Sequence, residues 1–210
     1  MTYSLYYHPK SGHAYKVGLF FALSSIPVSM CFVDIDKPLE MRSTDFQKYT
    51  KFGEVPTLVH KNKVLAQSNN ILLYLAEQTG RLGPFADVSW TDIRMWLFWE
   101  ANRLGLALPN LRFAYHYDPT MPKGAFEWLH MRLDRDLNRF EKELADGRMF
   151  ILGKEITIAD LSLAGYIFWA DEAKIELEKW PRVFAWRERL KEQSGWLAPK
   201  DLMPYPMMAS

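Results

Sequence analysis

The chain has 210 residues and a formal net charge of +1 at pH 7, with 49% hydrophobic and 24% charged residues. This length fits one large domain or two small ones. Near-neutrality excludes the strong positive field with which proteins attract nucleic acid or anionic membranes, so neither partner is expected. Basic residues among the first twenty, and no later apolar run of about 20 residues, predict no signal peptide or membrane span and hence a cytoplasmic protein.

A single cysteine, Cys31, excludes an internal disulfide and any Cys-x-x-Cys metal or redox pair. It lies in the apolar run 28–33, which predicts a buried strand and an inert core thiol. No metal site is expected.

The first 80 residues alternate between strand-like and helix-like stretches. Strands are expected at 3–7 and 28–33, joined by a helix with apolar residues at helical spacing, and a crossover of that length implies parallel pairing. A short helix over 39–49, strands at 57–60 and 63–66, and a helix from Ser68 to Gly80 follow. This order predicts a thioredoxin-like domain over residues 1–80.

Residues 81–89 are interpreted as a linker, and residues 90–210 show helical spacing only. Helices are expected from Trp90 to about Pro109 (followed by a loop), from a cap at Thr120 to Gly147, from a capping box at Thr157, and from Pro181. The predicted fold class is an α/β thioredoxin-like domain followed by an all-α domain, with a tail over 201–210 that either covers a cleft or is loose.

Two segments indicate a binding site. Pro56 stands directly before a predicted strand, so it marks a turn that directs the N–H and C=O of Val55 toward an extended peptide ligand. Gln67 and Ser68 open a helix, whose backbone N–H groups suit a carboxylate. Together these segments point to a small peptide ligand.

Val55-Pro56 before a short strand, followed by Gln67-Ser68-Asn69-Asn70-Ile71-Leu72 on a helix, resembles the glutathione-binding signature of cytosolic glutathione S-transferases. The loop around Ser11-Gly12-His13 resembles bacterial members, and Thr157-Ile158-Ala159-Asp160 matches the family's capping box in the helical domain. The resemblance implies a cis Pro56, backbone pairing of Val55 with the cysteinyl unit, and a γ-glutamyl carboxylate held by Gln67 and Ser68. It also implies glutathione as co-substrate without a further cofactor, and a homodimer in which the thioredoxin-like domain of one subunit meets the helical domain of the other.

The same resemblance makes Ser11 the donor to the glutathione sulfur, with Tyr7 as the main alternative. A free thiol with pKa ~8.5 is only about 3% thiolate at pH 7. Lowering that pKa by ~2 units requires ~2.7 kcal/mol, which one hydroxyl donor and a helix N-terminus can supply. Ser11 as a mere helix cap, and Tyr7 as a packing residue, are the structural alternatives.

Glu54 departs from the family, because many relatives carry Gln or Lys there and a carboxylate would repel the nearby glycyl carboxylate. A basic residue is expected to hold that glycyl group, the candidates being Lys10, Lys16, Arg42, Lys48 and Lys51.

Candidates for an apolar electrophile pocket in the helical domain are Trp96, Trp99, Phe113, Tyr115 and Tyr117.

The expected activity is therefore conjugation of glutathione to small hydrophobic electrophiles, or glutathione-dependent peroxide reduction. A non-catalytic interaction or regulatory member of the fold is the alternative, because a fold does not determine a function. A cysteine-based disulfide reductase is disfavoured by the absence of a cysteine near Ser11.

Overall fold

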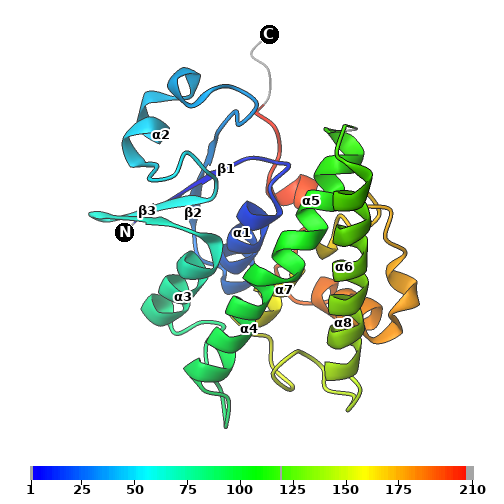
Figure 1. Cartoon of the computed structure of the whole chain (residues 1–210). Helices are drawn as coiled ribbons and strands as arrows, with labels where there is room; N and C mark the ends of the chain where they lie inside the picture. The colour runs from blue at the N-terminus through cyan, green and yellow to red at the C-terminus, as the bar shows by residue number, and fades with distance from the viewer. Residues whose placement is uncertain (1, 119, 207–210) are drawn as a thin grey trace. The chain divides into compact units, whose positions relative to one another are not determined.

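The computed structural model describes residues 2–118 and 120–206, which form two compact units (Figure 1). The first comprises the described residues of Met1–Arg81 and Ser194–Ser210, and the second is Leu82–Gln193. The sequence-based division placed the segment after residue 193 in the helical domain. Its described part, residues 194–206, belongs instead to the first unit, whereas residues 207–210 of the predicted tail lie outside the described residues.

Within the described residues, the first unit contains a four-stranded sheet in the order β2-β1-β3-β4. β1 pairs in parallel with β2, as the crossover length predicted, and β3 pairs antiparallel with both β1 and β4. Both predicted strands of the hairpin are confirmed. The strands are β1 (Tyr3–Tyr7), β2 (Val28–Phe32), β3 (Thr57–His60) and β4 (Lys63–Ala66).

Helices cover both faces of this sheet, with α1 (Gly12–Ser24) and α3 (Ser68–Thr79) on one face and α2 (Thr44–Tyr49) on the other (Figure 1). A short 3₁₀ helix, η1 (Leu39–Met41), precedes α2. Because successive strand side chains alternate between faces, Tyr3 packs on Phe21 of α1 and Tyr6 packs on Phe46 of α2, with ring centroids 5.2 and 5.8 Å apart. The sheet is therefore the centre of a three-layered unit.

β2 lies at the sheet edge, so the prediction of a buried strand there is wrong. Its five residues are all partly or fully exposed, because no further strand covers the outer side. Cys31 packs beside Tyr6 and Phe46 but stays half-buried. Burial, and secondarily the charge of Asp45, raises the pKa of its thiol.

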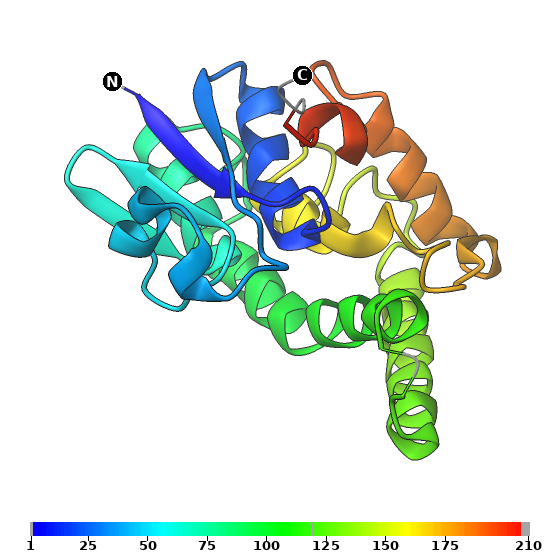
Figure 2. The same ribbon diagram turned by 90° about the horizontal axis from the view of Figure 1, so that it is seen from above.

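The C-terminal segment belongs to the first unit because it packs along α1. The Tyr15 hydroxyl donates to the carbonyl of Leu197 at 2.8 Å. α9 (Pro199–Leu202) lies beside α1 in Figure 2, where the side chain of Leu202 approaches Gly18 so closely that a Cβ there would stand 3.3 Å away. Met203, which follows, is fully buried.

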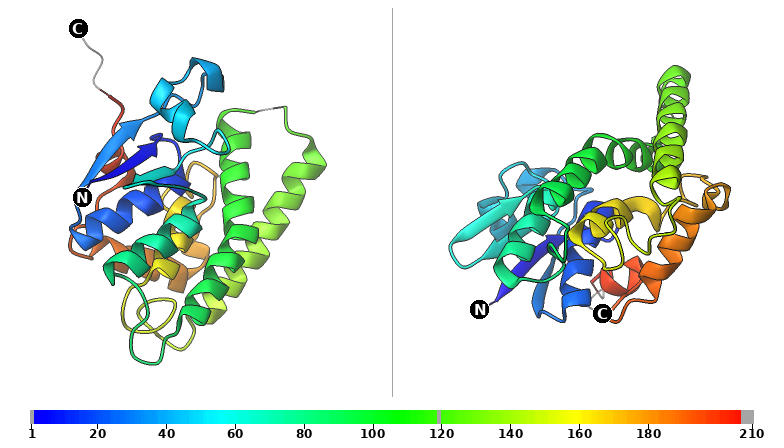
Figure 3. Two further views of the ribbon diagram at one scale, coloured as in Figure 1. Left: turned by 90° about the vertical axis from the view of Figure 1, so that its left-hand side faces the viewer. Right: turned by 90° about the horizontal axis from the view of Figure 1, so that it is seen from below.

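The second unit consists of helices around one apolar core. α5 and α6 run side by side (Figure 3). No helix of the described residues has the length and apolar character needed to cross a bilayer. The helices are α4 (Trp90–Asn102), α5 (Leu104–His116), α6 (Lys123–Glu143), α7 (Ile158–Ile167), η2 (Leu177–Lys179) and α8 (Pro181–Lys191).

The helix predicted from Trp90 to about Pro109 is in fact two helices, and the loop predicted after Pro109 is wrong. The chain bends at Arg103, and Pro109 lies inside α5, which continues to His116. The buried carboxylate of Glu100 lies against Gly105 in the first turn of α5, where a negative charge is favourable. The two residues are only five positions apart, but their contact has no periodic signature.

The predicted capping box at the start of α7 is confirmed. The Asp160 carboxylate accepts from the backbone N–H of Thr157 at 3.0 Å, from the N–H of Ile151 at 2.8 Å and from the Trp186 ring at 2.9 Å. Burial raises the pKa of this carboxyl, and these hydrogen bonds oppose the shift. By contrast Thr120 does not cap α6, which begins after Pro122; its hydroxyl donates to Asp118.

We expect Gly105→Ala to lower the free energy of unfolding by about 2 kcal/mol, because the new Cβ would stand 2.5 Å from a Glu100 carboxylate oxygen. Gly124→Ala is the matched control: Gly124 is also helical, and nothing lies within 4 Å of its added Cβ. Alanine there is expected to be neutral or stabilising by up to about 1 kcal/mol. Urea unfolding of both variants checks this, and equal stability of the two would contradict it.

Candidate functional site

The sheet register brings three separate chain segments to one edge. Tyr6 of β1 stands opposite Thr57 of β3, and Thr57 stands opposite Ala66 of β4. The end of β1, the start of β3 and the end of β4 therefore lie in one row across the sheet. The segments that follow or precede these ends are residues 8–11, residues 50–56 and the start of α3. They hold Ser11, Glu54, Val55, Pro56, Gln67 and Ser68, whereas Tyr7 is the last residue of β1, and of the basic candidates only Lys10 and Lys51 lie in these segments.

The turn before β3 has the form that the resemblance implied. The Val55–Pro56 peptide bond is cis. Within the part of the chain that the structure describes, neither the N–H nor the C=O of Val55 bonds to another backbone group. Both groups stand at the start of a strand, and the geometry suits pairing with an extended peptide.

Arg42 holds this turn from the side. Its guanidinium donates to three carbonyls, those of Gly53 at 2.6 Å, Lys37 at 2.9 Å and Ile35 at 3.1 Å. Gly53 has φ +73°, a conformation that favours glycine. Arg42 thus has a positioning role that spacing did not reveal, and its donors serve the chain itself.

The other basic candidates for the glycyl carboxylate have varied surroundings. Lys10 pairs with Asp36 at 3.0 Å, and this hydrogen bond lowers the pKa of the Asp36 carboxyl. Lys16 is buried. Lys48 and Lys51 lie over the rings of their neighbours Tyr49 and Phe52. Of these, Lys51 is nearest in sequence to the Val55 turn.

The start of α3 is open to an anion in its local geometry. No side chain caps the helix, and Gln67 at the cap has φ +65°. Ser68 is largely buried and Gln67 is exposed, with its side-chain amide donating to the Glu54 carboxylate at 3.3 Å. Glu54 therefore lies beside the positive end of α3, a position in which its charge is partly compensated.

Ser11 caps α1 and is 7% exposed. Its hydroxyl oxygen accepts from the N–H of Ala14 at 3.1 Å, which leaves the hydroxyl proton to donate elsewhere. The capping role and the sulfur-contact role are therefore compatible. A hydroxyl that accepts a hydrogen bond is also polarised into a better donor.

Tyr7 has a different use for its hydroxyl. It donates to the carbonyl of Pro204, in the C-terminal segment, at 2.7 Å. Burial, and secondarily Cys31, raises the pKa of this hydroxyl. The contact joins positions 197 residues apart, so no sequence spacing could have indicated it. The proton of the Tyr7 hydroxyl is therefore used within the chain.

The five aromatic residues predicted for the electrophile pocket lie in different surroundings within the second unit, and Tyr117 is exposed beside Phe113. Trp96 belongs to the core, with Trp99 packed against it at 5.3 Å. Phe113 is 51% exposed, whereas Tyr115 contacts Phe126 and His130. Residues two apart on a helix point in nearly opposite directions, so Phe113 and Tyr115 do not share one face.

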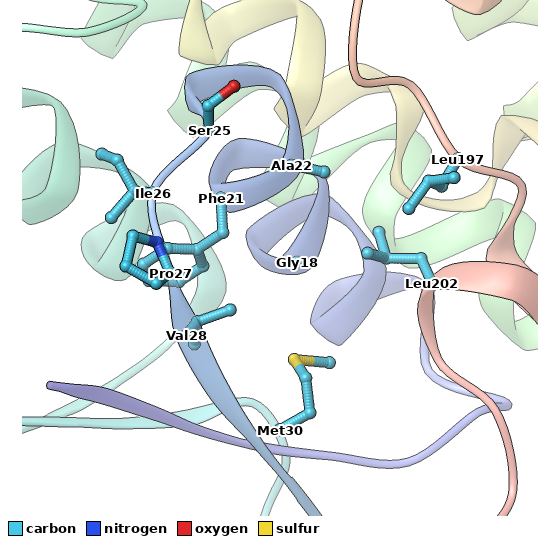
Figure 4. A pocket seen from close by; sticks show the side chains of 10 residues that line it. All are labelled: Gly18, Phe21, Ala22, Ser25, Ile26, Pro27, Val28, Met30, Leu197 and Leu202. Atoms are coloured by element: carbon cyan, nitrogen blue, oxygen red, sulfur yellow. The ribbon is translucent and has the colours of Figure 1, made fainter.

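A cavity of about 380 Å³ lies in the first unit at the opposite end of α1 from Ser11 (Figure 4). Its walls are apolar and come from the end of α1, the start of β2 and the C-terminal segment. None of the predicted site residues lines it. The lining residues are Gly18, Phe21, Ala22, Ser25, Ile26, Pro27, Val28, Met30, Leu197 and Leu202.

Models of the glutathione S-transferase N-terminal and C-terminal domains match residues 11–78 and 125–189. A possible glutathione S-transferase from Rhodopseudomonas palustris is 31% identical, with a TM-score of 0.80 over 94% of this chain and 97% of its own. The chain therefore belongs to the glutathione S-transferase family. Its fold is the thioredoxin-like domain plus helical domain of that family, as predicted.

Two other relatives are named for different reactions. A glutathione S-transferase from Pseudomonas fluorescens is 27% identical, with a TM-score of 0.84 over 95% of this chain and 99% of its own. The disulfide-bond oxidoreductase YfcG of Escherichia coli is 26% identical over 90% of each chain. Both relatives are matched over nearly their full length.

We expect Glu54→Gln to tighten glutathione binding by about three-fold, because it removes a charge that repels the glycyl carboxylate and keeps the hydrogen bond to Gln67. The gain should shrink at high salt. Glu77→Gln, near the far end of α3, changes net charge equally and is the control. Calorimetric titration measures all three proteins. Weaker binding by Glu54→Gln would mean that the carboxylate contacts a cationic group of the ligand.

Proposed function

We propose that this protein activates the thiol of glutathione as a thiolate and transfers it to hydrophobic electrophiles. The observation that carries the proposal is the Ser11 hydroxyl, which stands at the N-terminus of α1 with its oxygen bonded to Ala14 and its proton left for a ligand. Val55 offers its backbone pair, and Gln67 and Ser68 offer the open start of α3. The strand register supports the proposal, because the loops that carry these residues adjoin the strand ends at one edge of the sheet.

The chemistry needs no general base on the protein. The thiol proton leaves to solvent, and the positive helix end and the Ser11 donor stabilise the sulfur anion. The thiolate then attacks an electrophilic carbon, forming a C–S bond while the leaving group departs with its electron pair. With a hydroperoxide, the thiolate attacks the terminal oxygen, the O–O bond breaks, and the alcohol leaves with a proton from solvent. A second glutathione thiol then attacks the resulting glutathione sulfenic acid, which gives glutathione disulfide and water.

Disulfide reduction is a second candidate, favoured by the relationship to YfcG. The chain's one cysteine is half-buried with a raised thiol pKa, so it suits this reaction poorly. The thiolate of bound glutathione would instead attack the disulfide and release one thiolate. A second glutathione would then resolve the mixed disulfide. Conjugation and disulfide reduction would both use Ser11. A non-catalytic role would need only the groups that bind the glutathione peptide, which are those of Val55, Gln67 and Ser68.

We expect Ser11→Ala to lower turnover at least ~10-fold and to raise the pKa of the bound thiol, because one unit of pKa corresponds to a ten-fold change. Glutathione affinity should change little. Tyr7→Phe is the matched hydroxyl deletion and should keep turnover within about two-fold, while losing about 1 kcal/mol of stability with its bond to Pro204. The absorbance of the bound thiolate measures its pKa in each variant. Turnover is measured separately with an activated aryl halide and with a mixed disulfide. The reverse pattern would transfer the role to Tyr7.

The proposal includes a cytoplasmic homodimer. Two side chains on α4, Met95 and Phe98, are 60% and 71% exposed, and apolar groups of this size are commonly covered by a partner. We expect Phe98→Glu to dissociate the dimer in sedimentation velocity, because it would bury an unpaired charge. Thr91→Glu, at an exposed position on the same helix, is the control and should leave the dimer intact. A wild-type monomer at micromolar concentration would contradict the proposal.

A further inference from the structure

His8 is the first residue after β1 and is buried to 1% exposure. Two of its polar groups hold the loop that leads to Ser11. The ring atom Nδ1 accepts from the backbone N–H of Lys10 at 3.1 Å, and the carbonyl accepts from the backbone N–H of Ser11 at 2.9 Å. One residue therefore fixes two consecutive amides of the loop formed by residues 8–11.

The ring of His8 is itself held in place. It packs against Phe32 at the end of β2, with centroids 5.6 Å apart, and Tyr205 of the C-terminal segment meets it edge-on at 5.7 Å. Phe32 and Tyr205 also contact each other at 6.1 Å. An imidazole packed between two rings presents Nδ1 in one direction only, so its acceptor is preorganised for Lys10.

The position of the Ser11 hydroxyl depends on this loop, because Ser11 is its last residue. Its backbone N–H is bonded to His8, and its side chain caps α1. A displacement of about 1 Å of a catalytic group can cost up to about 100-fold in rate. Loss of the Nδ1 acceptor would release the amide directly before Ser11 and so loosen the hydroxyl position.

We propose that His8 is a positioning residue that holds the Ser11 hydroxyl toward the sulfur of glutathione, through its ring acceptor for Lys10 and its carbonyl. This inference rests on the proposed function only for the role of Ser11. The hydrogen bonds of His8 to Lys10 and Ser11 do not depend on any ligand. Histidine is required here for an acceptor at the δ position, and asparagine is the side chain that reproduces that acceptor.

The test compares His8→Asn, which keeps a δ acceptor, with His8→Leu, which removes it. We expect His8→Leu to raise the pKa of the bound thiol by about one unit, with a ~10-fold loss of kcat. The KM for glutathione should stay within about two-fold, because Val55, Gln67 and Ser68 are untouched. His8→Asn should recover most of the loss. Amide exchange at Lys10 and Ser11 should accelerate in His8→Leu and return toward wild type in His8→Asn.

The matched control is His60→Leu. His60 is also buried, and its Nδ1 is bonded to the Tyr74 hydroxyl at 2.8 Å, away from the loop. It should lower thermal stability without changing the thiol pKa or exchange at Lys10 and Ser11. The inference is overturned if His8→Leu keeps wild-type exchange at these amides, or if His8→Asn is as impaired as His8→Leu. If exchange responds as expected but wild-type protein does not ionise bound glutathione, the proposed function fails and the loop-holding role stands.

Discussion

The pairing of β1 with β3, and of β3 with β4, is the constraint on which the candidate site depends. Because Tyr6, Thr57 and Ala66 occupy one row, loops that are up to 60 residues apart along the chain meet at one edge. A shift of one residue in either pair would also turn the apolar side chains to the wrong face. The core and the site are therefore specified by the same hydrogen bonds, and the loops need only supply functional groups.

Different kinds of contact hold those loops in place. Arg42 donates to the carbonyl of Gly53, which precedes the Val55 turn, whereas His8 acts through its ring and carbonyl on the Ser11 loop. Both residues act on backbone groups through hydrogen bonds. Such bonds are directional, which suits a hydroxyl that must meet a sulfur atom.

Local patterns predicted much of this molecule. A few neighbouring residues sufficed to predict the hairpin strands and the capping box at Thr157. The family motif that contains Pro56 predicted its cis peptide bond. The failures involve contacts that leave no pattern along the chain. Apolar content could not show that β2 lacks an outer neighbour, and Pro109 does not reveal the bend at Arg103 or the Glu100 carboxylate that lies beside it. The Tyr7 bond to Pro204 is likewise invisible locally.

The C-terminal segment has a consequence for how the molecule is made. Because residues 194–206 complete the unit that residues 2–81 begin, the helical unit is in effect an insertion into the thioredoxin-like one. Proteins are synthesised from the N-terminus, so Tyr7 and Tyr15 gain their carbonyl partners only after residues 82–193 have been made and residues 194–206 have left the ribosome. A chain interrupted before residue 194 would contain all of the second unit but would lack the segment that completes the first.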